Sequence, residues 1–398
     1  MRILSNDYAS NVPDNPSVGH GGPAQFAAGF SDFVSSRGHK WIGVYLRPGE
    51  CPDGTAPFEV SGTAGSRSYV SFVFSRPHLQ AFMQSRKHID ARAWFGPQIA
   101  SLRELIREHR PEVLFLNGFS VFAWALMEAA RLEGLPIVIQ HAGIAQVEFE
   151  MYRHLYSSVA RRAVLKMEQE IVQAATKQVF LNAFSRDAFC RRVAPVPKAQ
   201  SAIIPLPFQK HFLAKVPKAR GKKGGSFVIG CVARWDRIKN HDAFLRLAKE
   251  AGRRGLDWTF RAVTKIPDTA VQKRFKDAYR KTVDIVPPMP SAELLGFYRS
   301  VDLLVLPSHF DVSPTVVMEA ALQGKTTVIS PNVGWVSEYR ANGLRGAVVD
   351  FSDEAEAVDR MQALLKKSPS VRFRRMVRVA HAPARVFATY LRLFRSVI

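Results

Sequence analysis

The sequence predicts an α/β protein with two doubly wound parallel sheets, one in each half. At 398 residues the chain is long for a single hydrophobic core and comfortable for two domains. Short apolar strands alternate with helical patterns in both halves, the order typical of parallel sheets. A stretch rich in Pro, Lys and Gly, residues 203–225, separates the halves. We therefore expect domains at 1–207 and 208–375, and a C-terminal helical segment, 376–398, that packs back on the first domain.

The first half begins with a strand at Met1 and a helix over residues 23–36. That helix carries apolar residues at helical spacing and a proline in its first turn. Proline is tolerated there because backbone N–H groups of the first turn have no hydrogen-bond partner within the helix. Apolar runs predict the strands that follow, at 41–46, 113–116, 137–140 and 178–181.

The second half repeats the pattern, and one unit of it carries two acids. Its strands are predicted at 227–232, 258–263, 303–306 and 326–329. Between the last two strands lie Asp311, in a loop, and Glu319, about two turns into a helix. Open α/β sheets bind ligands outside the carboxyl ends of their strands. We therefore expect both acids to face one crevice.

Two cations follow the strand that opens the second half. Arg234 and Lys239 fall in the loop between that strand and a helix that starts near His241. Cationic side chains beside a helix N-terminus are suited to holding a diphosphate. Taken alone, these two residues are explained equally well by a solvated surface loop.

The net charge of +22 lies mostly in the second half. Residues 209–223 hold six basic residues and no acid, and ten basic residues with no acid lie between Arg360 and the C-terminus. Charge of this kind attracts polyanions: phosphorylated substrates, nucleic acid or an anionic membrane leaflet. A basic proteome or a solvated face is the alternative explanation.

The end of the chain is helical, basic and interrupted by Pro383, which predicts a kink or two abutting helices. Packing on the first domain explains its apolar stripe, and contact with a membrane surface is the alternative. The stripe consists of Val386, Phe387, Tyr390, Leu391 and Phe394.

Cysteine usage and hydropathy favour a cytoplasmic protein. Three cysteines, odd in number and far apart, exclude a disulfide framework and show no metal-ligand spacing. The start of the chain lacks the apolar core of a signal peptide. The longest apolar stretch, 113–127, is too short and too polar for a membrane span.

The motifs of the second half recur together in one family. They are Gly230, Arg234, Lys239, Pro307-Ser308, Asp311, Glu319-Ala320, Gly324 before the run 326–329, Gly334, Glu338, Gly343 and Gly346. In this spacing the second half resembles the nucleotide-sugar-binding domain of glycosyltransferase family 4, or glycosyl transferases group 1, retaining enzymes of the GT-B fold. The resemblance implies two Rossmann-like domains that face a central cleft.

The first half is similar to the family more loosely. His20-Gly21-Gly22-Pro23 matches a Gly-Gly loop that approaches the sugar and phosphates, and His141-Ala142-Gly143 matches a His-x-Gly element. A tight turn at Gly21-Gly22 and a hydrogen-bonded loop histidine at His141 are the structural alternatives.

One departure from the family pattern concerns an acid. The family has Glu where this chain has Asp311, which is one methylene shorter. The carboxylate is kept but its reach is not, so we expect donor-sugar recognition or turnover to differ here.

The resemblance implies a role for each site residue. Arg234 and Lys239 would meet the negative charge of the leaving nucleoside diphosphate, helped by backbone N–H groups at Thr315, Val316 and Val317. Glu319 would accept hydrogen bonds from the ribose hydroxyls, and Asp311 would contact the donor sugar. His141 would lie near the sugar across the cleft, while Gly21 and Gly22 would let the backbone approach donor and acceptor.

The same resemblance implies a nucleotide-sugar donor and no resident cofactor or metal, since no Asp-x-Asp motif is present. The acceptor is unknown; a lipid-linked saccharide is expected, with the protein peripheral on the inner face of the cell membrane. The expected setting is cell-surface polysaccharide or glycolipid biosynthesis, with retention at the anomeric carbon.

Two other classes remain open. A sugar-nucleotide epimerase of the GT-B fold would share the fold and the diphosphate site, and product analysis without acceptor separates it from a transferase. A nucleic-acid-binding protein would explain the charge, but the sequence contains no helix-turn-helix, zinc-finger or RNP-type motif. Binding at rising salt tests that reading, because phosphate-driven association weakens steeply.

Overall fold

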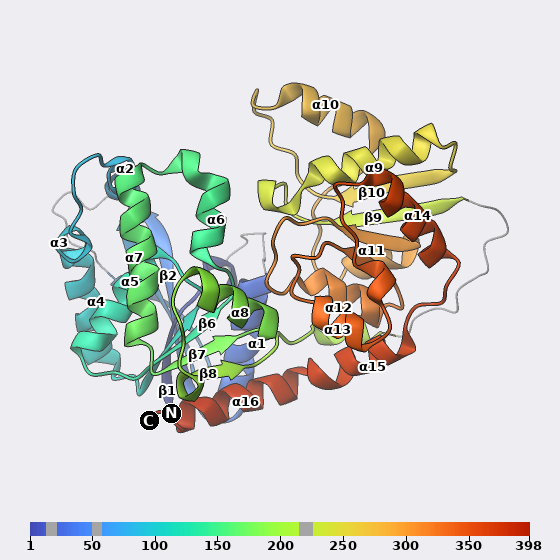
Figure 1. Ribbon diagram of the computed structural model, residues 1–398. Helices are drawn as coiled ribbons and strands as arrows, with labels where there is room; N and C mark the ends of the chain where they lie inside the picture. The colour runs from blue at the N-terminus through green and yellow to red at the C-terminus, as the bar shows by residue number, and fades with distance from the viewer. Residues whose placement is uncertain (13–21, 50–57, 215–225) are drawn as a thin grey trace. The chain divides into compact units, whose positions relative to one another are not determined.

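The chain divides into two compact units in the computed structural model (Figure 1). Unit 1 comprises Met1–Leu206 together with Ala384–Ile398, and unit 2 comprises Pro207–Pro383. The structure describes residues 1–12, 22–49, 58–214 and 226–398.

The second unit extends further than the predicted boundary at residue 375. Helix α15 (Val371–Ala380) belongs to unit 2, because its Phe373 ring packs on Trp335 at 5.8 Å and on Tyr339 at 5.0 Å between centroids. The expected segment 376–398 is therefore wrong at its start. The chain passes into unit 1 only at Ala384, where Pro383 opens the next helix.

Unit 1 is built on a sheet of eight strands within its described residues, in the order β3-β4-β2-β1-β5-β6-β7-β8. Every neighbouring pair is parallel except β3 and β4. The strands are β1 (Arg2–Asn6), β2 (Lys40–Gly49), β3 (Phe58–Ala64), β4 (Arg67–Ser75), β5 (Val113–Asn117), β6 (Ile137–His141), β7 (Lys177–Phe180) and β8 (Ser201–Ile203).

The hairpin β3–β4 lies outside the sequence prediction. Ser, Gly, Thr, Glu and Arg interrupt their apolar residues, so neither strand contains an apolar run longer than three residues. Gly65 turns the chain between them with φ at 61°, a conformation that glycine adopts without a steric penalty.

Different helices cover the two faces of the unit 1 sheet (Figure 1). Alternation along β5 directs Leu114 and Leu116 into a core with α2, α4, α5 and α7, while Phe115 faces α1 and α16. The helices are α1 (Gly22–Ser36), α2 (Arg76–Gln84), α3 (Ala91–Trp94), α4 (Gly96–His109), α5 (Val121–Leu132), α6 (Ala145–Tyr152), α7 (Ser158–Ala174), α8 (Ala183–Arg192) and α16 (Pro383–Arg395).

Unit 2 holds a second parallel sheet, in the order β11-β10-β9-β12-β13 within its described residues. Its strands are β9 (Phe227–Val232), β10 (Trp258–Val263), β11 (Asp284–Val286), β12 (Leu303–Leu306) and β13 (Thr326–Ile329). Its helices are α9 (His241–Arg253), α10 (Lys273–Thr282), α11 (Leu294–Ser300), α12 (Thr315–Leu322), α13 (Val336–Ala341), α14 (Glu354–Leu365) and α15.

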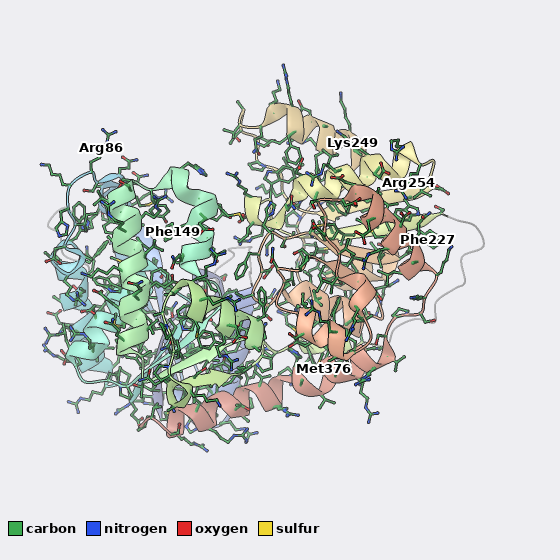
Figure 2. All side chains as sticks on the ribbon, in the orientation of Figure 1. Arg86, Phe149, Phe227, Lys249, Arg254 and Met376 are labelled. Atoms are coloured by element: carbon green, nitrogen blue, oxygen red, sulfur yellow. The ribbon has the colours of Figure 1, made fainter. Side chains whose placement is uncertain are left out.

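In unit 2, as in unit 1, different helices cover the two faces of the sheet. Phe244 of α9, Tyr279 of α10 and Met361 of α14 form one buried cluster with the sheet. On the other side of the sheet lie α11, α12, α13 and α15 (Figure 1). The hydrophilic side of α9, which carries Lys249, projects away from the sheet (Figure 2). No helix among the described residues combines the length and the apolar character needed to cross a membrane.

The last helix completes the core of unit 1. Val386, Phe387, Tyr390, Leu391 and Phe394 of α16 are each 5% exposed or less. The rings of Phe387, Tyr390 and Phe394 meet an aromatic cluster from α1 and β5, with centroid distances of 5.2–5.8 Å. The stripe that the sequence analysis singled out is thus buried inside unit 1, and it is not available to a membrane.

A buried chain of hydrogen bonds joins α16 to the start of α1. The Tyr390 hydroxyl donates to Gln140 Oε1, and Gln140 Nε2 donates to Asn117 Oδ1 at 2.9 Å. Asn117 Nδ2 in turn donates to the Pro23 carbonyl at 2.8 Å. Asn6 fixes the middle of the chain, because its Oδ1 accepts from the Asn117 backbone N–H at 2.7 Å. The first turn of α1 is therefore held from the C-terminal end of the sequence.

Replacement of the tyrosine hydroxyl tests this network. Tyr390→Phe leaves Gln140 Oε1 buried without its donor, so we expect the free energy of unfolding to fall by about 1–3 kcal/mol in urea denaturation. Thr389→Ala is the control, because it removes a hydroxyl that bonds the Arg385 carbonyl on the exposed side of the same helix. That variant should change stability by less than about 0.5 kcal/mol. Equal losses in the two variants would contradict the network's role.

Candidate functional site

Three loops of unit 2 meet at the carboxyl edge of its sheet. They follow β9, β12 and β13, which are neighbouring strands in the order β9-β12-β13. Parallel strands end at the same edge, so their loops converge there. This is the place where the sequence predicts a ligand site.

The loop after β9 is shaped by two capping residues. Asp236 accepts from the Ile238 backbone N–H at 3.0 Å and starts a 3-10 turn that ends at Lys239. Asn240 then takes a left-handed conformation, with φ at 54°, and its side chain caps the N-terminus of α9. These caps fix the backbone on both sides of Lys239.

His241 holds the upstream part of the same loop. Its Nε2 donates to the Arg234 carbonyl at 2.8 Å, and its Nδ1 accepts from the Tyr279 hydroxyl at 3.1 Å. The Trp235 ring stacks on it at 4.6 Å. Burial lowers the pKa of His241, so the neutral ring is the form that makes both bonds.

Backbone contacts join this loop to the one after β12. The His309 N–H donates to the Ile238 carbonyl at 2.8 Å, and Asn240 Nδ2 donates to the Pro307 carbonyl at 3.1 Å. The third loop is attached through Asp311, whose N–H donates to Asn332 at 3.1 Å and whose carbonyl accepts from Gly334 at 2.9 Å.

An ion pair crosses the junction. Lys239 Nζ donates to Asp311 Oδ2, and the two side chains are 17% and 12% exposed. Two predicted site residues are therefore brought together, 72 positions apart in the sequence. The sequence suggested a phosphate contact for Lys239 and a sugar contact for Asp311. In the structure these two side chains form an ion pair with each other.

Arg234 differs from Lys239 in its freedom. Its side chain is 78% exposed, and its nearest carboxylate is Asp236 at 3.7 Å. At that distance and exposure the ion pair contributes little. Arg234 is thus an exposed cation of the loop, as Arg237 also is, and its contact with a diphosphate stays a prediction.

Glu319 does not lie where the sequence placed it. Helix α12 starts at Thr315, so Glu319 is about one turn into the helix and not two. Its carboxylate is 5% exposed and accepts from the Tyr298 hydroxyl at 2.6 Å. Burial raises the pKa of Glu319, while bonds from Tyr298 and Thr315 lower it. The Glu319 carboxylate is therefore enclosed, and the expectation that Asp311 and Glu319 face one crevice stays a prediction.

The first turn of α12 lies directly after the Asp311 loop. Pro314 precedes the helix, and Thr315, Val316 and Val317 form its first three positions. Trp335 Nε1 donates to the Pro314 carbonyl at 3.0 Å and fixes this start. The Val317 N–H already donates to the Pro314 carbonyl at 3.3 Å, so the donors that this turn presents, with its partial positive charge, are the N–H groups of Thr315 and Val316.

His141, at the end of β6 in unit 1, is buried and not open to a cleft. It is 2% exposed, its ring stacks on Phe180 at 4.8 Å, and its Nε2 donates to Gln178 at 3.0 Å. Its Nδ1 has no partner among the described residues. Burial lowers the pKa of His141 to about 4, so it is neutral at pH 7. The His141 ring is therefore not exposed for the predicted contact with the donor sugar.

The predicted Gly-Gly loop is described only in part. Gly22 is the first residue of α1, and Gly21, with His20, lies outside the described residues. No group of three or more His, Cys, Asp or Glu side chains is placed to hold a metal ion in the described parts of the chain.

Glu168 is a buried acid that sequence reasoning missed. It lies on α7 and accepts from the backbone N–H groups of Ala145 at 2.8 Å and Gln146 at 3.2 Å, the first two residues of α6. It therefore holds the segment after His141-Ala142-Gly143. Burial raises its pKa to about 7, and Glu148 adds to the shift. In the sequence Glu168 looks like an ordinary exposed acid on a helix, so no pattern indicated that it is buried.

Comparison with known proteins relates most of unit 2 to a described family. The family model described as Glycosyl transferases group 1 matches residues 214–378. A D-inositol 3-phosphate glycosyltransferase of Nocardia farcinica is 28% identical over 171 residues, which cover 41% of this chain and 38% of that protein. One of Mycolicibacterium smegmatis is 31% identical over 104 residues, or 26% and 24% of the two chains. The chain thus spans about two fifths or less of these relatives' length.

Solved structures resemble the whole chain. Sucrose-phosphate synthase from Thermosynechococcus elongatus has a TM-score of 0.75 at 14% identity, covering 99% of this chain and 98% of that one. An E. coli trehalose-6-phosphate structure bound with UDP-2-fluoro glucose has a TM-score of 0.68 at 14% identity, with both chains fully covered. These likenesses confirm the predicted GT-B fold, and the family match confirms the resemblance drawn from the motifs of the second half.

The ion pair across the loops predicts different stabilities for the two cations. Lys239→Met leaves the Asp311 carboxylate without its partner, so the free energy of unfolding should fall by about 1–3 kcal/mol. Arg234→Met, at an exposed position, should change it by less than about 0.5 kcal/mol. Chemical denaturation measures both. Adding Asp311→Asn to Lys239→Met should restore part of the loss, and an unchanged Lys239→Met would refute the pairing.

The buried acid on α7 predicts a pH dependence. The raised pKa of Glu168 contributes stability that is present below its ordinary value of 4.5 and is lost as pH rises through about 7. Relative to Glu168→Gln, which does not ionise, the wild type should lose about 2 kcal/mol of unfolding free energy between pH 5 and pH 8. Urea denaturation across this range measures the difference. A constant difference would show that Glu168 stays charged in the fold.

Proposed function

We propose, from the match of residues 214–378 to the family model described as Glycosyl transferases group 1, that this chain is an enzyme that transfers a sugar from a nucleoside-diphosphate sugar to an acceptor. The observation that carries the proposal is the pair of cations at the carboxyl edge of β9. Arg234 is exposed there, and Lys239 is anchored to Asp311 beside the first turn of α12.

The chemistry of the reaction needs positive charge at this place. When the bond between the anomeric carbon and the diphosphate breaks, the diphosphate oxygen gains negative charge. Fixed cations and helix N–H groups stabilise that charge without having to reorganise during the reaction. Arg234 would bind the diphosphate from the solvent side, and Lys239 with the N–H groups of Thr315 and Val316 would bind it from within the loops.

The ion pair gives Asp311 a second role. In the free protein the Asp311 carboxylate balances the positive charge of Lys239. When the donor binds, its diphosphate would balance that charge instead. Asp311 would then accept hydrogen bonds from the donor sugar while it still orients the ammonium group. The shorter arm of Asp, compared with the family's Glu, keeps the carboxylate close to Lys239, and this is where we expect sugar preference to differ.

Glu319 requires a rearrangement to act on the ribose. Its carboxylate now accepts from Tyr298, so donor binding would have to replace or share that hydrogen bond. His141 lacks an exposed ring, and we propose that it supports the loop of residues 142–144 rather than the sugar directly.

Other parts of the function rest on the family and on charge. We infer retention at the anomeric carbon, no metal and a setting in cell-surface polysaccharide or glycolipid biosynthesis. The similar proteins named D-inositol 3-phosphate glycosyltransferase favour a phosphorylated acceptor. A lipid-linked saccharide at an anionic membrane surface also fits the basic second half, in a cytoplasmic protein that associates peripherally.

Donor binding tests the proposal. The protein is titrated with UDP-, GDP-, ADP- and dTDP-sugars by calorimetry, and nucleotide release is measured. We expect one nucleotide class to bind, and Arg234→Met to weaken that binding about ten-fold or more, the value of one charge-assisted hydrogen bond. Lys249→Met, the same charge change on the exposed side of α9, is the control and should leave binding unchanged.

Two outcomes would reject the transferase. The proposed donor site would be contradicted if the protein bound no sugar nucleotide, or if Arg234→Met bound it as tightly as the wild type does. Formation of an epimerised sugar nucleotide in the absence of acceptor would show that the protein is an epimerase and not a transferase.

A further inference from the structure

A groove of about 410 Å³ lies in unit 1 between α1 and α16, helices that pack on each other through Phe30 and Phe387 (Figure 1). We call it the arginine groove. It is lined by Phe33 and Arg37 at the C-terminal end of α1 and by Ala388, Leu391, Arg392 and Arg395 of α16. All six residues belong to unit 1, and the proposed donor site uses none of them.

The charge of the arginine groove has one sign. Its charged lining residues are Arg37, Arg392 and Arg395, and no Asp or Glu is among the described residues that line it. Three like charges that share one hollow repel one another. An anion that enters the hollow relieves this repulsion and gains from all three cations.

The contacts that these arginines make are with neutral groups. Arg37 lies 5.1 Å from the centre of an aromatic ring in the same groove, and Arg392 Nη2 donates to the Thr389 hydroxyl at 3.0 Å. Arg395 Nη2 lies 3.4 Å from His39 Nε2. Burial lowers the pKa of His39, so this ring is uncharged at pH 7. None of these contacts neutralises a guanidinium group.

Helix dipoles explain only part of this arrangement. Arg392 and Arg395 lie in the last turn of α16, and Arg37 directly follows α1. A cation at the C-terminal end of a helix is favourable, so each residue is individually suited to its place. The dipoles do not require that three guanidinium groups from two helices line one hollow.

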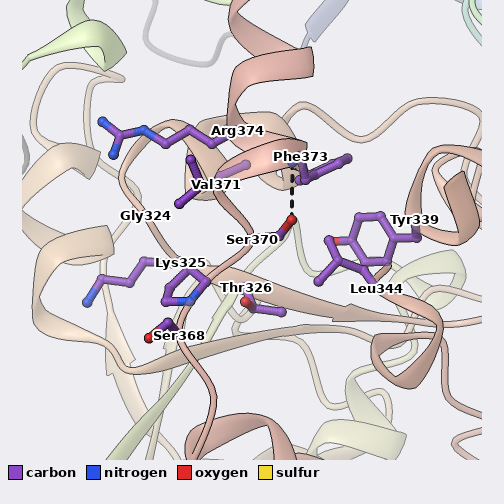
Figure 3. Close-up of a pocket in the computed structure, with 12 residues that line it drawn as sticks. Gly324, Lys325, Thr326, Tyr339, Leu344, Ser368, Ser370, Val371, Phe373 and Arg374 are labelled. Atoms are coloured by element: carbon purple, nitrogen blue, oxygen red, sulfur yellow. Dashed lines mark hydrogen bonds between the residues drawn. The ribbon is translucent and has the colours of Figure 1, made fainter. Parts of the chain in front are cut away.

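A smaller cavity of about 250 Å³ in unit 2, at the start of α15, shows the contrast (Figure 3). Polar side chains in its lining serve the fold. Ser370 caps α15 by accepting from the Phe373 N–H at 3.1 Å, and Lys325 Nζ donates to the Arg299 carbonyl at 3.4 Å. The arginine groove is larger, and its three cations lie at the surface.

Volume and charge together define a ligand for the arginine groove. Its volume lies in the range of small-molecule sites, and Phe33, Ala388 and Leu391 give it an apolar floor. A phosphate monoester carries close to two negative charges at pH 7 and offers three oxygens to guanidinium groups, whereas a carboxylate carries one charge. Because the cations line a hollow, one molecule can enter among them and a flat bilayer surface cannot.

We propose that the arginine groove binds a soluble phosphate monoester that carries an apolar substituent. The three guanidinium groups would bind the phosphate oxygens, and the substituent would lie on Phe33 and Leu391. The groove would be an anion site of unit 1 that does not depend on the proposed donor site of unit 2.

Phenyl phosphate is the probe, because it joins a dianion to an apolar ring. Its binding to the full chain is measured by calorimetry. Arg37→Met/Arg392→Met/Arg395→Met should weaken this binding at least ten-fold, because charge-assisted hydrogen bonds are lost. Inorganic phosphate, which leaves the apolar floor uncovered, should bind more weakly than phenyl phosphate.

The matched control is Lys249→Met/Lys281→Met/Arg385→Met. It removes three exposed charges outside the groove, one of them on α16, and should bind phenyl phosphate like the wild type. Arg234→Met is the second control and should also leave this binding unchanged. Sedimentation with phosphatidylcholine vesicles that contain phosphatidic acid tests a lipid headgroup as the alternative source of phosphate.

Four results would overturn the proposal. They are equal binding of phenyl phosphate by the groove variant and its matched control, binding that is lost in Arg234→Met, equal affinity for phenyl phosphate and inorganic phosphate, and dependence on the three arginines for vesicles alone.

Folding of the groove variant is checked by urea denaturation. Where it does not fold, Arg392→Glu alone reverses one charge at an exposed position and should weaken phenyl phosphate binding at least ten-fold. Retained binding in that variant would equally contradict the proposal. Because donor binding is measured with sugar nucleotides and Arg234→Met, failure here leaves the glycosyltransferase proposal standing, and the reverse also holds.

Discussion

The arrangement of the candidate site depends on the ion pair between Lys239 and Asp311. Each charge loses water when its side chain becomes mostly buried, and the other charge offsets that cost. The pair joins the loops after β9 and β12, and the backbone of Asp311 joins the loop after β13 through Asn332 and Gly334. The ion pair therefore adds a charged contact to a junction that backbone hydrogen bonds between the same loops also hold.

Unit 1 is organised by a comparable constraint. Its sheet leaves Phe115 and the rings of α1 uncovered until α16 returns from the end of the chain. The Tyr390 hydroxyl then completes a buried polar chain through Gln140 and Asn117 to the first turn of α1. The apolar cluster supplies the stability and the polar chain fixes the register, since an unpaired amide would be costly in that core.

The amino-acid sequence by itself determined the two α/β halves, the strands β9, β10, β12 and β13 of the second half, though not β11, and the residue types of the proposed donor site. Apolar periodicity and fixed motif spacing are local properties, so Arg234, Lys239 and Asp311 could be found by reading along the chain. Only the tertiary structure decided that Lys239 pairs with Asp311, that Glu319 is buried against Tyr298 and that His141 is enclosed. Burial and partner choice depend on residues distant in sequence, and no local pattern records which side chains the fold brings into contact.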